Sequence, residues 1–227
     1  MMGFRRIVIV GALVMTAWTV TPAPLSAQLL GQVSTANTMA ANANDVDGYV
    51  GLLGQVSTAN TMAANANDVG GYVGLLDHAT TLFGQYRRRL AGNGDFGVQF
   101  GLIDYERANA RLMLGGDVKF QVMNAASNDP FDLAFDSRLM FVDYHESSLL
   151  SIGESVVMSH DYQVSNGSTL SPYGAVNLRL DHLSSHTDWQ VAAVGGVKWE
   201  LSDLMDALGE VVFDNEMGIV LGLNFKL

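Results

Sequence analysis

The side chains best suited to catalysis lie in one short stretch, Asp181-His-Leu-Ser-Ser-His186. A serine hydroxyl becomes a nucleophile when an imidazole accepts its proton and a carboxylate orients that imidazole. His182 and Ser184 would share one face of an extended chain, with Glu200 as the carboxylate further along. Alternation along the chain, however, places Glu200 on the face opposite to His182. We therefore expect a polar loop and no enzyme, with a serine hydrolase as the alternative.

Metal chemistry would require carboxylates or imidazoles that meet in space. Hard cations such as Ca²⁺ and Mg²⁺ bind carboxylate oxygens. Acidic residues recur in and beside the segments that interrupt the apolar patterns, at Asp104, Glu106, Asp143, Glu146, Asp181 and Asp188. His182 and His186, flanked by two of these aspartates, could instead hold a transition metal. We expect no metal and no cofactor, and these residues are the candidates if an ion binds.

A larger set of charges occupies alternate positions in segments with the spacing of strands. Its members are Asp117, Lys119, Asp132, Asp136, Arg138, Arg179, Asp181, Lys198, Glu200, Glu210 and Lys226. Charges enclosed in a narrow interior must pair, because each unpaired charge costs several kcal/mol. We expect these residues to form a salt-bridge network that closes a lumen. The alternative is a gated ion pathway in which the pairs exchange partners.

The elements that carry these charges follow a period of two from about residue 95 onward. The last segment shows the pattern most clearly, since Met217, Ile219, Leu221, Leu223, Phe225 and Leu227 share one side of a strand. Turn-forming residues separate eight such segments, at 96–102, 112–122, 131–141, 149–160, 173–181, 189–200, 207–214 and 217–227. The pattern predicts an all-β fold over residues 93–227, an eight-stranded antiparallel up-and-down barrel.

The first 92 residues are of three kinds. Residues 1–27 have the basic start, apolar run and small-residue cleavage site of a secretory signal peptide. Residues 28–74 contain two 23-residue units, 29–51 and 52–74, which differ only at Asp47 and Gly70. Their poverty in large apolar residues predicts a flexible or loosely helical segment.

Residues 75–92 have a helical period. The apolar side chains recur at helical spacing and three consecutive arginines follow, which predicts a short amphipathic helix at the periplasmic mouth of the barrel. The alternative is an interfacial helix whose arginines meet lipid phosphates.

Alternation alone does not show whether the apolar face of the barrel points inward or outward. A soluble barrel encloses its apolar face, whereas a membrane barrel turns that face to lipid. The export signal, the apolar last strand and a set of glycines on the polar face favour the membrane. These glycines are Gly97, Gly101, Gly115, Gly196, Gly218 and Gly222. They would make room for long side chains in a narrow lumen.

Charge and composition limit the partners. Without the signal peptide the chain has 10 basic and 23 acidic residues, a net charge of −13, which argues against nucleic acid as a partner. The absence of cysteine excludes disulfides and thiol nucleophiles.

Three stretches of the barrel segment resemble the small eight-stranded outer-membrane barrels of the OmpA/opacity-like class. They are Ser-Pro-Tyr-Gly-Ala-Val-Asn-Leu-Arg-Leu at 171–180, Val-Gly-Gly-Val-Lys-Trp-Glu-Leu-Ser-Asp at 194–203, and the last strand, 218–227. The chain departs from that class at Phe225-Lys226-Leu227, where an aromatic residue usually comes last. Separately, a His-x-Ser pair with a later glutamate resembles the arrangement in outer-membrane lipid A deacylases.

The resemblance implies an architecture rather than an activity. We expect a monomeric outer-membrane protein with both termini in the periplasm and a structural or surface-interaction role. Its partners would be outer-membrane lipid, lipopolysaccharide and, through the last strand, the barrel-assembly machinery. A small ion-conducting barrel and a lipid A-modifying enzyme are the alternatives.

Overall fold

The computed structural model describes residues 56–62, 66–76, 78–90, 92–105, 110–144, 147–165, 167–183, 186–214 and 217–227. The predicted signal peptide (1–27) and the first repeat unit (29–51) lie outside these residues. Within the described part of the chain, no helix is long and apolar enough to cross a membrane.

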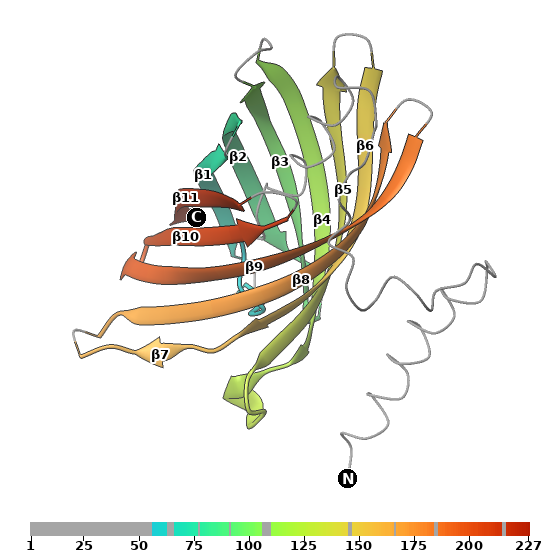
Figure 1. The fold of residues 1–227 in the computed structure, drawn as a ribbon. Helices are drawn as coiled ribbons and strands as arrows, with labels where there is room; N and C mark the ends of the chain where they lie inside the picture. Colours follow the sequence, from blue (N-terminus) through green and yellow to red (C-terminus); the bar gives the residue numbers. More distant parts are fainter. Residues whose placement is uncertain are drawn as a thin grey trace, which may run out of the picture. The chain divides into compact units, whose positions relative to one another are not determined.

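The described residues form one antiparallel sheet of 11 strands (Figure 1). In chain order these are β1 (Asn67–Leu76), β2 (Ala79–Arg89), β3 (Gly94–Tyr105), β4 (Arg111–Met123), β5 (Asp132–Tyr144), β6 (Ser147–Ser159), β7 (Tyr162–Gln163), β8 (Thr169–Leu183), β9 (His186–Ser202), β10 (Met205–Phe213) and β11 (Met217–Lys226). A single 3₁₀ turn, η3 (Ala125–Ser127), joins β4 to β5. β6 pairs with β8, so ten strands close into a barrel, while β7 lies outside it and pairs with β8.

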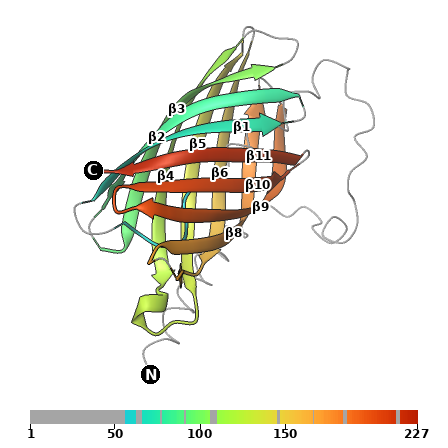
Figure 2. The same cartoon turned by 90° about the vertical axis from the view of Figure 1, so that its left-hand side faces the viewer.

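The first and last strands of the barrel are neighbours (Figure 2). β1 begins and β11 ends at the same end of the barrel, where Asp68 lies opposite Lys226. We call this end the mouth. The connections β1–β2, β3–β4, β5–β6, β8–β9 and β10–β11 lie at the other end, which we call the far end.

Each strand alternates between the two faces of the barrel wall. In β2, for example, Phe83, Gln85 and Arg87 are buried in the interior, whereas Leu82 and Tyr86 are exposed on the outside. Successive side chains of a strand point to opposite faces. The outward positions are mainly apolar, whereas the inward positions hold charged, polar and small residues together with some large apolar ones.

The predicted amphipathic helix at 75–92 is wrong. These residues complete β1 and form β2, which pairs with β1 on one side and β3 on the other. The apolar residues that would share one helical stripe are divided between the two faces, with Leu82 outside and Phe83 inside. Main-chain pairing on both sides supports the strand, and helical spacing in a short segment does not exclude it.

The predicted count of eight strands is also wrong, and with it the eight-stranded barrel that the resemblance implies. The eight predicted segments all form strands, as β3–β6 and β8–β11. Without β1 and β2, however, β3 and β11 would each have an unpaired edge. β1 comes from the end of the second repeat unit, residues 67–74, which we expected to be flexible or loosely helical.

Large side chains fill the barrel interior away from the mouth. Tyr72 stacks on Phe83 with 4.9 Å between ring centroids. A Cβ at Gly222 would lie 2.1 Å from Cδ1 of Tyr72, so the ring occupies space that only glycine leaves open. Nearer the far end, Ile103, Met113 and other apolar side chains are almost completely buried.

Candidate functional site

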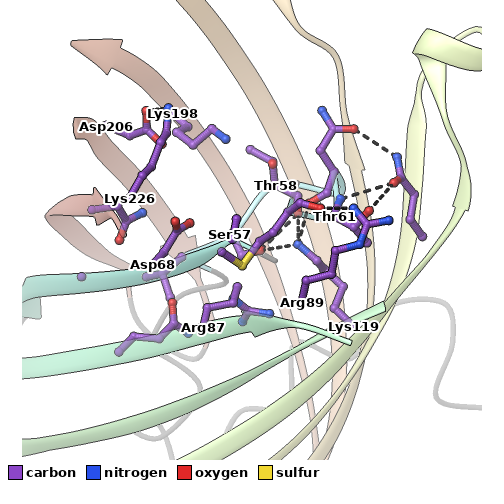
Figure 3. A pocket seen from close by; sticks show the side chains of 18 of the residues that line it. Ser57, Thr58, Thr61, Asp68, Arg87, Arg89, Lys119, Lys198, Asp206 and Lys226 are labelled. Atoms are coloured by element: carbon purple, nitrogen blue, oxygen red, sulfur yellow. Dashed lines mark hydrogen bonds and ion pairs between the residues drawn. The ribbon is translucent and has the colours of Figure 1, made fainter. Parts of the chain in front are cut away.

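A cavity of about 590 Å³ lies inside the mouth of the barrel (Figure 3). Its charged lining consists of Asp68, Arg87, Arg89, Lys119, Asp161, Lys198, Asp206 and Lys226. Most of these residues occupy inward positions near the mouth ends of β1, β2, β4, β9, β10 and β11. The cavity is therefore a polar chamber, in contrast to the apolar packing near the far end.

One side of this chamber is formed by the short segment Val56–Met62, which we call the plug segment. It belongs to the second repeat unit and precedes β1. Val56, Thr58 and Ala59 are buried to 2%, 3% and 0% exposure, although none of them belongs to a helix or strand. Its small residues explain why an irregular segment fits inside a barrel.

Lys119 makes the densest set of contacts with the plug segment. Its ammonium group donates to Oγ of Ser57 at 2.6 Å and to the carbonyl oxygens of Thr58 at 2.7 Å and Asn60 at 2.9 Å. An ammonium group has three N–H donors, so these contacts use all of them. Lys119 is only 1% exposed, and the plug segment therefore supplies the hydrogen-bond acceptors of a buried cation.

Glu210 and Ser159 anchor main-chain N–H groups of the plug segment. Val56 donates to Oε1 of Glu210 at 2.6 Å, and Ala59 donates to Oγ of Ser159 at 3.1 Å. Val56 has φ of 41°, in the left-handed region that β-branched residues rarely adopt. Its bond to a buried carboxylate offsets that backbone cost.

Gln121 binds the other end of the plug segment through both halves of its amide. Oε1 accepts from N and Oγ1 of Thr61 at 3.3 and 3.0 Å, while Nε2 donates to Oδ1 of Asn60 at 3.0 Å. The same Nε2 also donates to Asp132 at 3.0 Å. The plug segment is thus held by side chains from β4, β6 and β10.

Behind the plug segment, Arg87 joins two buried aspartates. Its guanidinium bonds Asp95 and, at 2.5 Å, Asp117. Asp95 is also 3.5 Å from Nζ of Lys119, so the plug contacts and the wall charges belong to one network. The predicted lumen residues do not include Arg87 and Asp95, because residue 87 falls in the predicted helix (75–92) and residue 95 precedes the first predicted strand (96–102). The sequence signal that could have placed Arg87 is a period of two, which puts Phe83, Gln85 and Arg87 on the same side of a strand.

Two further charge clusters lie apart from this network. Near the far end, Arg179 bonds Asp181 at 2.7 Å and Asp214 at 2.5 Å, all with side chains at most 3% exposed. At the mouth, Lys226 bonds Glu200 at 2.9 Å and Asp206 at 3.1 Å.

The eleven residues predicted to line the lumen all occupy inward positions on their strands. Besides the residues already placed, Arg138 bonds Asp136 at 3.4 Å and Lys198 lines the mouth cavity. The structure distributes them between the mouth, the middle and the far end of the barrel.

The residues of the alternative hydrolase site are not brought together. His182 is exposed at the far end, where its Nδ1 lies 2.8 Å from Oγ1 of Thr187. Glu200 lies near the mouth end of the neighbouring strand, and Ser184 lies outside the described residues.

The acidic candidates for a metal site are scattered. Asp104 and Asp143 are exposed near the far end, whereas Asp181 is buried against Arg179 rather than lying on the rim. Glu106 and Glu146 lie outside the described residues. Within the described ranges, no group of three or more histidine and acidic side chains could hold a metal ion.

No protein-family model matches the chain, and no curated protein matches it in sequence. Among solved structures, the "Bacterial polysaccharide outer membrane secretin" is similar with a TM-score of 0.46 and 13% identity over 73% of this chain. This chain spans 66% of the length of the secretin chain.

Two smaller barrels are similar over almost their whole length. "KdgM porin" has a TM-score of 0.39 and 5% identity, covering 70% of this chain and 98% of that chain. The N-terminal β-barrel domain of Pseudomonas aeruginosa OprF has a TM-score of 0.36 and 9% identity, covering 72% of this chain and 98% of that chain.

Proposed function

We propose that this chain is a non-enzymatic β-barrel protein that spans an outer membrane and has a structural role in the cell envelope. Its lumen is closed by the plug segment and by buried charge pairs. The barrel acts as a monomer, contacts lipid and lipopolysaccharide, and has its mouth in the periplasm. Its last strand, β11, is the segment that the barrel-assembly machinery would engage.

The observation that carries this proposal is the polarity of the two faces of the wall. Each of the ten barrel strands exposes large apolar side chains, including Leu82, Phe100, Ile152, Val176 and Leu221. Conversely, Arg87, Lys119, Asp136 and Glu210 are among the most buried residues of the molecule. A soluble barrel has the opposite arrangement, whereas a barrel in lipid needs this one.

The height of the apolar band also fits a membrane. On β9, Trp189 and Trp199 are exposed to 68% and 46% near the two ends of the strand. Ten residues at ~3.3 Å each separate them by about 33 Å along the strand. A strand tilt of about 40° reduces this separation to about 25 Å, the height of the apolar band in outer-membrane barrels, which aromatic residues flank.

A heat-modifiability gel on protein refolded in detergent tests the membrane barrel. We expect the unboiled sample to migrate differently from the boiled one and to have a β-rich circular dichroism spectrum. A monomer that is soluble in plain buffer and migrates identically with and without boiling would contradict the proposal, because its apolar outer face would then need another explanation.

Ion conduction is the second candidate, and the polar mouth cavity favours it. The cavity holds Lys198, Lys226, Asp68 and Asp206, which could line an entrance for ions. Beyond it the interior is filled by the Tyr72–Phe83 stack, by apolar side chains and by paired charges such as Arg179 with Asp181. We therefore expect no conductance steps in planar bilayers, either for the full chain or for a chain lacking residues 56–62. Discrete steps that require removal of residues 56–62 would favour a channel closed by this segment.

A further inference from the structure

Two buried side chains of β2 bring unbonded donors to the mouth cavity. Gln85 and Arg87 both line the cavity and are only 5% and 4% exposed. Nε2 of Gln85 and Nε of Arg87 have no hydrogen-bond partner in the described part of the chain. Buried polar atoms are normally bonded to protein, water or a ligand. These two residues therefore offer donors to an acceptor that enters the cavity.

Asp68 offers an acceptor in the same part of the cavity. It lies opposite Arg87 on one side and opposite Lys226 on the other. Neither cation forms an ion pair with it, since each already pairs with two other carboxylates. Among the described residues, Asp68 has no bonded partner. Its carboxylate can therefore accept from a cationic group of a ligand.

Lys198 offers a cation to the same ligand. It lines the cavity from β9 and has no bonded partner among the described residues. Figure 3 shows Lys198 and Asp68 on the same side of the cavity, with Lys226 between them. The ammonium group is carried on a flexible four-carbon stem, so it can approach a ligand bound next to Asp68.

The charges of these groups define the class of ligand. A simple anion would leave Asp68 unpaired beside it, and a simple cation would leave Lys198 unpaired. Side chains that lie opposite each other on one face of a sheet have their Cβ atoms about 5 Å apart, so the carboxylate of Asp68 and the donors of β2 are close together. The complementary ligand therefore has a positive and a negative group close to each other. An α-amino acid has both groups on one carbon atom.

We propose that the mouth cavity is a binding site for a free α-amino acid. The carboxylate of the ligand accepts from Lys198, Gln85 and Arg87, and its ammonium group donates to Asp68. The cavity volume of about 590 Å³ leaves room for a side chain, and the polar lining favours a hydrophilic one. This binding activity is separate from the structural role proposed above, and it does not depend on the compartment that the mouth faces.

Isothermal titration calorimetry on the full chain, refolded in detergent, tests the proposal with L-serine and L-glutamine as probes. We expect saturable binding at one site. N-acetyl-L-serine lacks the ammonium group and L-serinamide lacks the carboxylate, so each should bind at least about tenfold more weakly than L-serine. Absence of saturable binding for both amino acids, or equal binding of the blocked compounds, would overturn the proposal.

Two variants test the charged groups separately. Lys198→Met and Asp68→Asn should each weaken the binding of L-serine at least about tenfold, because each removes one charge-assisted hydrogen bond. Neither residue has a bonded partner among those described, so both variants should fold and remain heat-modifiable. Asp104→Asn is the matched control, since Asp104 is exposed near the far end and should not affect binding. Unchanged affinity in either cavity variant would overturn the proposal.

Side-chain amide signals report on Gln85 directly. In a chain labelled with ¹⁵N-glutamine, the Nε2 signal of Gln85 should shift when L-serine is added, because this nitrogen gains an acceptor. Gln163 is the internal control, since its Nε2 donates to Oγ1 of Thr169 at 3.0 Å outside the barrel. A Gln85 signal that does not move, or that moves no more than the Gln163 signal, would contradict the proposed site.

Discussion

At the scale of single residues, the central interaction is the burial of the Lys119 ammonium. The side chain is 1% exposed, and its three N–H groups donate hydrogen bonds to three oxygens of the plug segment. A buried cation is stable only when its hydrogen bonds and its charge are both compensated. Asp95 supplies part of the charge compensation, at 3.5 Å, and is itself paired with Arg87 on the neighbouring strand, β2.

We predict that Lys119→Met lowers the free energy of unfolding by about 3 kcal/mol, because it leaves plug carbonyl groups and a buried carboxylate with fewer partners. Denaturant unfolding of the refolded barrel measures this change. Lys198→Met is the matched control, since Lys198 lines the same cavity but has no bonded partner among the described residues. It should change stability by less than about 0.5 kcal/mol. Equal effects of the two variants would contradict the role of Lys119.

A second residue-scale feature is a polar pair on the outer face. Glu154 lies near the middle of β6, where Oγ of Ser137 on β5 donates to its Oε2 at 2.8 Å. Its neighbours along the strand, Ile152 and Val156, are exposed and apolar. If lipid surrounds the barrel, a carboxyl group at this depth is unfavourable.

We predict that Glu154→Leu stabilises the barrel in lipid vesicles by about 1 kcal/mol, as measured by denaturant unfolding. Ser137→Ala serves as the control, because it removes the same hydrogen bond but leaves the carboxyl group in place. A loss of stability in Glu154→Leu would mean that the carboxyl group has a favourable partner on the outer face.

At the scale of elements, the pairing of β1 with β11 closes the barrel on one side. Tyr72 of β1 lies directly opposite Gly222 of β11. The ring lies over this glycine, and the Tyr72 hydroxyl bonds Asn224, two residues further along β11. Register across this junction is therefore set by one large residue and the space that one glycine leaves for it.

Gly222→Ala tests that junction. We predict a loss of about 1–3 kcal/mol in the free energy of unfolding, because the added methyl group would overlap a buried ring. The control is Gly195→Ala on β9, where a Cβ meets no atom within 4 Å. That variant should differ from the natural chain by less than about 0.5 kcal/mol. A tolerated Gly222→Ala would show that the ring can move away from β11.

At the scale of the whole molecule, the distribution of polarity is the inverse of that in a soluble protein. Apolar side chains surround the outside, and most of the charged residues on the barrel strands are enclosed. In lipid this arrangement satisfies every main-chain group through closed pairing and places the charges where they can find partners. The cost of an outward charge should consequently depend on its depth.

We predict that Leu221→Arg, in the middle of β11, costs about 2–4 kcal/mol in vesicles, whereas Met217→Arg at the end of the strand costs about 0–1 kcal/mol. The two side chains are equally exposed, at 54% and 55%, so exposure alone predicts equal effects. Denaturant unfolding in vesicles compares them. Similar, small effects at both positions would contradict a membrane-spanning barrel.

The faces on which most side chains of the regular strand segments lie could be predicted from the sequence. Lys119, Arg179 and Glu210 could be placed on the polar face because the two-residue period of a strand is a local property. The same reasoning distinguished the apolar face, for example at Leu221 and Phe225. Eight of the ten barrel strands were predicted for this reason.

The number of strands that close the barrel, and the segment that fills its mouth, could not be predicted from local pattern. Residues 75–92 fit a helical period as well as a strand period, and pairing with β3 and β11 selects the strand because it leaves no open sheet edge. The plug segment has small residues without any period, so its position depends on partners far away in the sequence, such as Lys119, Ser159 and Glu210. Local pattern specifies which way a side chain points, whereas closure and burial depend on which distant segments meet.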